Sequence, residues 1–141
     1  MKAERNRLKR WQRLERMREI AKRAAAIEAA EAETALAQLA LLSEHAAALA
    51  GQYGARSGET NGAALRHLHG FARALAGISA STASDADRAR TVADARQQDL
   101  ASAERSRSTV AEHAARKGRE LARRETAVSL VARRGFGTGL E

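Results

Sequence analysis

The chain has 141 residues, no proline, no cysteine and only four aromatic residues, and its formal net charge at pH 7 is +8. Leucine, isoleucine, valine and phenylalanine together number 23, too few large side chains for a wide globular core. The absence of cysteine excludes disulfides and thiolate metal sites, and no apolar run reaches the roughly 18–20 residues of a membrane span. The abundant Ala, Arg, Glu and Leu favour helices over disorder.

The charge is distributed unevenly along the chain. Residues 1–23 carry a net charge of +7 and residues 113–141 carry +4, whereas residues 24–62 carry −4. If the chain folds back on itself, its two basic ends meet at one tip. Such a tip suits nucleic acid, an anionic membrane surface or an acidic protein, and it also fits a plain solvated helix face. Because no apolar segment follows the basic start, we expect a cytoplasmic protein without a secretory leader.

The first predicted helix covers residues 3–50. Its larger apolar residues recur in steps of three and four, which is typical of a coiled-coil seam. The predicted seam consists of Leu8, Trp11, Leu14, Met17, Ile20, Ala24, Ile27, Ala35, Leu39, Leu42, Ala46, Leu49 and Tyr53. The phase of the steps changes along this series, so we expect one or two stutters in the supercoil.

A loop is predicted over residues 51–62. It contains four glycines within twelve residues, a pattern typical of a helix C-cap followed by a loop. Either Thr60 or Asn61 can cap the helix that follows.

The second predicted helix covers residues 63–133, and a flexible tail is predicted over residues 135–141. One heptad frame runs from Leu65 to Val131 without a shift. Serine and threonine side chains compete for backbone hydrogen bonds, so we expect local unwinding or a kink between Ser79 and Ser84.

Folding at the loop predicts an all-α protein, two long helices in an antiparallel coiled-coil hairpin that forms a single domain over residues 1–134. In this register Leu42 faces Leu75 and Trp11 lies near Ser106. The second helix then outruns the first by a basic overhang that begins at about Lys117.

The sequence contains no recognisable catalytic pattern. His67 and His69 are two residues apart, so a helix would turn them to different faces. No phosphate-binding loop, nucleophile elbow or zinc-binding helix motif occurs. A slender hairpin also offers no deep pocket. We therefore expect no enzyme activity, no cofactor, no metal site and no small-molecule substrate.

A family resemblance covers the chain from Leu8 to about Glu125. It is carried by residues 8–14 (LKRWQRL), by the Ala/Glu/Leu stretch that ends in Tyr53, by residues 68–71 (LHGF) and by the charged run 104–125. In these features and in its length the chain resembles the flagellar export protein FliJ and its type III secretion relatives. The resemblance implies a non-enzymatic coiled-coil stalk or adaptor of flagellar protein export, located in the cytoplasm at the inner-membrane face of the basal body.

The resemblance also implies two docking sites, besides contacts with export chaperones. A patch near the loop would contact the export-gate membrane protein, at the matching positions Gln38, Leu42, Phe71, Leu75 and Ile78. The basic end would enter the ring of a hexameric export ATPase, through Arg5, Arg7, Arg10, Arg13, Arg116, Lys117, Arg123 and Arg124. The chain departs from the family where His45 and Leu49 replace tyrosines and where a glycine-rich tail replaces an acidic stretch.

Two other functions stay open: a basic helical nucleic-acid-binding protein and a membrane-surface coiled coil. The first predicts an affinity that falls steeply with salt, and the second predicts binding to anionic vesicles. Glu4, Glu15 and Glu19 interrupt the basic run, and stacking aromatics are scarce, so nucleic-acid binding is disfavoured.

Overall fold

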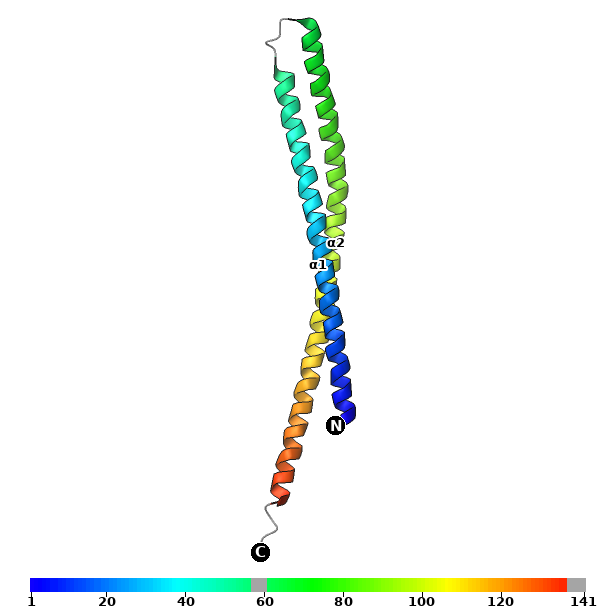
Figure 1. The fold of residues 1–141 in the computed structure, drawn as a ribbon, viewed down its shortest axis with the longest axis vertical. Helices are drawn as coiled ribbons and strands as arrows, with labels where there is room; N and C mark the ends of the chain where they lie inside the picture. The colour runs from blue at the N-terminus through cyan, green and yellow to red at the C-terminus, as the bar shows by residue number, and fades with distance from the viewer. Residues whose placement is uncertain (57–60, 137–141) are drawn as a thin grey trace. The chain divides into compact units, whose positions relative to one another are not determined.

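Two helices make up the fold of the computed structural model, which describes residues 1–56 and 61–136. Helix α1 spans Lys2–Ala55 and helix α2 spans Gly62–Phe136 (Figure 1). The described part of the chain contains no strand. The predicted all-α class and the packing of two long helices against each other are confirmed.

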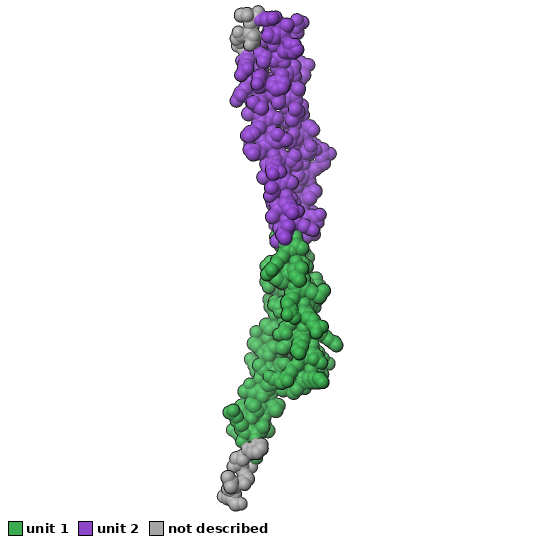
Figure 2. All heavy atoms as spheres, in the orientation of Figure 1, with its two compact units in different colours: residues 1–25, 100–141 green, residues 26–99 purple. Residues whose placement is uncertain are grey.

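Contacts divide the chain into two compact units (Figure 2). We call residues 1–25 together with 100–141 the terminal unit, and residues 26–99 the loop unit. In each unit a stretch of α1 lies antiparallel to a stretch of α2. Examples of cross-helix pairs are Arg5–Glu125 and Lys22–Glu104 in the terminal unit, and Glu28–Arg96 and Tyr53–Phe71 in the loop unit.

Helix α1 ends later than predicted. It continues through Gly51 and Gly54 to Ala55. None of the glycines in residues 1–56 and 61–136 has a positive φ, so neither Gly51 nor Gly54 forms the expected C-cap. Gly58 and Thr60 lie outside the described residues. At the other end of the chain, α2 extends past the predicted Arg133 to Phe136, and residues 137–141 of the predicted tail are also outside them.

Asn61 caps the start of α2. Its side-chain Oδ1 accepts a hydrogen bond from the Ala63 N–H at 2.9 Å, and its carbonyl accepts one from the Leu65 N–H at 3.0 Å. An N-terminal N–H of the helix is thereby satisfied, as expected for an asparagine at this position.

The helices pair about one heptad away from the predicted register. Trp11 lies against His113, with ring centroids 4.2 Å apart, rather than near Ser106. The hydroxyls of Ser43 and Ser79 each donate a hydrogen bond to the other residue's carbonyl, both at 3.0 Å. The predicted pairing of Leu42 with Leu75 is therefore wrong.

The reason for this offset lies at the loop. Tyr53, near the end of α1, contacts Phe71, which is already about two and a half turns into α2. Helix α2 therefore begins beyond the end of α1, as Figure 1 shows. The predicted register instead assumes that the end of α1 and the start of α2 lie at the same level.

Only part of the stripe predicted on α1 faces α2. Leu8, Trp11, Leu39, Ala46 and Tyr53 are buried or half-buried as predicted, whereas others are not. Met17, Ile20 and Ile27 are 65%, 67% and 59% exposed, and Leu42 and Leu49 are also exposed. Burial follows one heptad frame without a stutter. Its buried or half-buried members are Leu8, Trp11, Glu15, Lys22, Ala25, Ala29, Ala32, Leu36, Leu39, Ser43, Ala46, Ala50 and Tyr53.

The frame predicted for α2 holds from Leu65 to Leu121, except at the exposed Arg96 and Lys117. Most of the buried side chains in the two helices are small. The buried apolar residues of the described chain are Ala29, Ala46, Ala86, Ala93, Val110, Ala114 and Leu121. At roughly 25 cal/mol per Å² of apolar area, each alanine contributes little, so the packing energy is spread along the helices.

Helix α2 is uninterrupted between Ser79 and Ser84, contrary to the expected unwinding. The hydroxyl of Thr82 is buried and donates to the Ile78 carbonyl at 2.6 Å. The Ser79 hydroxyl bonds the partner helix at Ser43. These hydroxyls therefore have partners that leave the helical backbone hydrogen bonds intact.

Candidate functional site

The loop unit carries exposed apolar residues beside its seam. Leu42 and Leu49 each precede a seam residue of α1, and Phe71 and Ile78 each precede a seam residue of α2. In an antiparallel pair, these flanking positions lie on the same side. We call these four residues the side face. Leu42, Phe71 and Ile78 are each about half exposed, so the side face is open to a partner.

The predicted gate-contact residues separate into three groups. Leu42, Phe71 and Ile78 belong to the side face. Leu75 is half-buried in the seam, and Gln38 is exposed on another part of α1. Leu49, one heptad after Leu42 on the same side of α1, was not among the predicted gate-contact residues.

Phe71 is held in place by a second aromatic residue. Its ring meets the Tyr53 ring edge-on, with centroids 4.8 Å apart, and the Arg56 guanidinium lies 4.8 Å from the Tyr53 ring centre. An edge-to-face pair of this kind favours one orientation of both rings. Phe71 thus combines a fixed position with an exposed surface, which suits an anchor for a partner.

Three of the eight predicted ATPase-contact residues form ion pairs in the terminal unit. Arg5 donates to the Glu125 carboxylate at 2.7 and 3.0 Å, Arg124 donates to Glu4, and Lys117 donates to Glu120 at 2.9 Å. The first two pairs also place the start of α1 beside residues 124 and 125. The overhang of α2 therefore begins near Thr126 and not at Lys117.

The other five predicted residues are exposed arginines. Within residues 1–56 and 61–136, none of them forms an ion pair: Arg7, Arg10, Arg13, Arg116 and Arg123. Arg119, which belongs to the same basic end, is also exposed and forms no ion pair in the described residues. The terminal unit has 19 Lys or Arg residues against 8 Asp or Glu, whereas the loop unit has 6 against 9.

A small cavity lies among these charges. Its volume is about 170 Å³, and it is lined by Glu4, Arg7, Leu8, Trp11, Lys117, Glu120, Leu121 and Arg124. Its apolar floor is Leu8, Trp11 and Leu121, and Leu121 is buried. The charged rim makes it suitable for contact with a polar protein surface.

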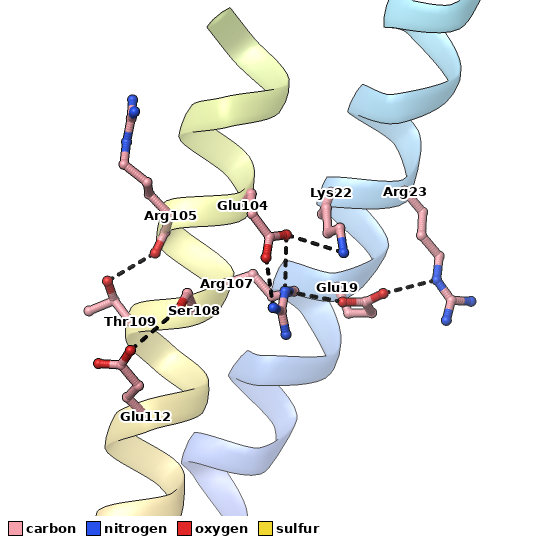
Figure 3. Close-up of polar contacts among 9 residues, drawn as sticks. All are labelled: Glu19, Lys22, Arg23, Glu104, Arg105, Arg107, Ser108, Thr109 and Glu112. Carbon is pink, nitrogen blue, oxygen red and sulfur yellow. Dashed lines mark hydrogen bonds and ion pairs between the residues drawn. The ribbon is translucent and has the colours of Figure 1, made fainter. Parts of the chain in front are cut away.

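An ionic network replaces apolar packing in part of the terminal unit (Figure 3). The Glu104 carboxylate accepts from Arg107 at 2.7 Å and pairs with Lys22 at 3.2 Å. Glu19 pairs with Arg107 at 3.5 Å and with Arg23 at 3.2 Å. The hydrogen bonds from Arg107 and Lys22 lower the pKa of Glu104 to about 2, and Glu104 in turn raises the pKa of Arg107. Glu104 and Arg107 therefore both stay charged at neutral pH.

No group of three or more His, Asp or Glu side chains in the described residues is placed to hold a metal ion. His67 and His69 are both exposed. Neither α1 nor α2 contains a stretch long and apolar enough to cross a membrane.

Comparisons with protein-family models, with curated proteins and with solved structures found no match to this chain.

Proposed function

We propose that this chain is a non-enzymatic coiled-coil adaptor of the flagellar type III protein export apparatus. It links the hexameric export ATPase to the export-gate membrane protein, from the cytoplasm at the inner-membrane face of the basal body, and it contacts export chaperones. The sequence resemblance supplies the identity of these partners, and the contacts in the two units support the assignment of one docking surface to each.

The observation that carries the proposal is the contrast between the two units. In the terminal unit, both helices contribute exposed arginines without ion pairs in the described residues, represented by Arg10 and Arg116. Such residues can approach an acidic partner without breaking an internal contact. In the loop unit, both helices contribute to an apolar side face, where Phe71 is the best anchored residue. The ATPase ring would therefore be recognised through charge, and the export-gate membrane protein through apolar contact.

A titration of the export ATPase with the full chain tests the proposal. We expect the ATP hydrolysis rate to rise, and we expect R7A/R10A/R13A to need about tenfold more chain for half-maximal stimulation. The matched control is R66A/R73A/R90A, which removes the same number of exposed arginines from the loop unit. An unchanged hydrolysis rate, or equal effects of the two triple variants, would contradict the proposal.

The exposed arginines also support a second function, the binding of nucleic-acid phosphates. In that case the chain would bind duplex DNA or RNA with an affinity that falls steeply with salt, while the ATPase rate would not respond. Capture on anionic vesicles with neither effect would favour a membrane-surface role instead.

A further inference from the structure

The cavity of the terminal unit lies where charged residues occupy the seam. Lys117 stands at a seam position of α2, where a large apolar side chain is usual, but it is exposed and pairs with Glu120. Glu4 and Arg124 also line the cavity, and they pair with each other. These long side chains turn to their ion pairs, so the two helices leave about 170 Å³ open above the apolar floor of the cavity.

The floor and the size of the cavity indicate the kind of group that it takes. The floor consists of Leu8, Trp11 and Leu121, of which Leu121 is buried and the other two are half-buried. Trp11 is held against His113, with ring centroids 4.2 Å apart. An apolar cavity of roughly 150 Å³ accommodates benzene. The cavity is therefore large enough for the side chain of a phenylalanine or a leucine.

The charge around the cavity favours a group that is flanked by acids. The lining contains three cationic side chains and two carboxylates, Glu4 and Glu120, both of which are already in ion pairs. Arg7 is the remaining cation, and it is exposed and has no ion pair in the described residues. A carboxylate beside an entering apolar group would complete this charge balance.

A shallower hollow of α1 adjoins the cavity. It is lined by Arg7, Arg10, Trp11 and Leu14, so it shares Arg7 and Trp11 with the cavity. Arg10, like Arg7, is exposed and has no ion pair in the described residues. Apolar surface and available arginines thus continue for about 10 Å along α1, from Arg7 to Leu14. This length suits a segment of protein chain better than a small molecule.

We propose that the cavity binds an acidic segment of a partner protein. The segment inserts one apolar side chain, of phenylalanine or leucine size, against Trp11 and places carboxylates beside Arg7 and Arg10. This proposal rests on the proposed function in taking the ATPase ring as the source of the segment. It adds that the basic end recognises its partner through an apolar anchor as well as through charge.

The fluorescence of Trp11, the only tryptophan of the chain, tests this proposal. The probe is a five-residue peptide in which two glutamates flank a phenylalanine on each side. We expect it to change the Trp11 emission in a saturable way when it is titrated into the full chain. Replacing the phenylalanine of the peptide by alanine, or its glutamates by glutamines, should weaken binding about tenfold.

Variants of the full chain locate the binding site. R7Q should weaken peptide binding about fivefold. The matched control is R16Q, which removes an exposed arginine on the opposite side of α1 and should leave the affinity unchanged. L8F enlarges the floor and fills part of the cavity, so it should weaken peptide binding at least about tenfold while the helical circular dichroism is retained.

Equal affinities for the phenylalanine and alanine peptides would overturn the proposal, and so would equal effects of R7Q and R16Q. The peptide comparison uses the native chain, so it does not depend on the folding of L8F. The ATPase titration fails separately. Peptide binding without ATPase stimulation would contradict the proposed function and leave the chemistry of the cavity standing. Stimulation of the ATPase that L8F leaves unchanged would overturn the cavity proposal alone.

Discussion

Phe71 shows how one side chain can be both fixed and available. Its contact with Tyr53 orients the ring, while half of its surface stays exposed. Aromatic side chains that become buried when a partner binds often dominate the energy of the interface. Phe71 is therefore the residue at which the proposed gate contact can be tested most sharply.

We predict that F71A lowers the affinity for the cytoplasmic part of the export gate by at least about tenfold. The matched control is V92A, which truncates an equally exposed residue at the equivalent heptad position of α2. Calorimetry with each variant measures both affinities. Equal losses in the two variants would argue against a localised contact at the side face.

Protonation of the Glu104 carboxylate links the stability of the folded chain to pH. Its pKa is about 2 in the folded chain because Arg107 and Lys22 hydrogen-bond the carboxylate, whereas the ordinary value is 4.5. The unfolded chain therefore binds a proton at higher pH than the folded chain does. The free energy that ionised Glu104 adds to the stability of the fold is fully present above about pH 5, and it is lost as the pH falls toward 2.

We predict that E104Q lowers the urea midpoint of unfolding at pH 6 and that its difference from the native chain disappears near pH 2. The control E33Q replaces an exposed glutamate with no ion pair in the described residues. Its midpoint should stay close to that of the native chain at both pH values. A difference for E104Q that persists unchanged at pH 2 would contradict the role of this carboxylate.

At the scale of the elements, α2 was easier to predict than α1. Its heptad frame runs unshifted, and the residues buried against α1 follow it closely. The isoleucines of α1 pointed to a seam that the structure leaves exposed. The true seam passes through Glu15 and Lys22, and the partner of Lys22 is Glu104, far away in the sequence. No local pattern in α1 could identify that partner.

The candidate sites were predictable where a local pattern was sufficient. Phe71 was among the predicted gate-contact residues, and it is half exposed beside the seam residue Ala72. Leu49 was predicted only as a seam residue, whereas the structure leaves it exposed beside the seam. Of the ion-paired residues Arg5, Lys117 and Arg124, only Lys117 has a partner that the sequence could indicate. The ion pairs of Arg5 and Arg124 join the two helices and therefore depend on the register.

The register itself can be tested by engineered disulfides, because the chain has no native cysteine. We predict that S43C/S79C forms an intramolecular disulfide under mild oxidation, since these two residues already exchange hydrogen bonds. The control S43C/A74C represents the register that the sequence alone had suggested. Faster closure of the control pair, measured by gel shift, would show that the helices slide by more than a turn.

At the scale of the whole molecule, the two units differ in charge and in the kind of surface they expose. The terminal unit is rich in arginine, and the loop unit is slightly acidic with an apolar side face. A chain of this kind can bind two unlike partners without using the same residues for both. We therefore propose that one chain bridges the ATPase and the gate.

Capture of the export ATPase on an immobilised gate fragment measures this bridging directly. We predict that the ATPase is retained only when the full chain is added. Retention should be lost with R7A/R10A/R13A, which still binds the gate, and with F71A, which still stimulates the ATPase. Retention without the chain, or displacement of the chain from the gate by the ATPase, would contradict the account.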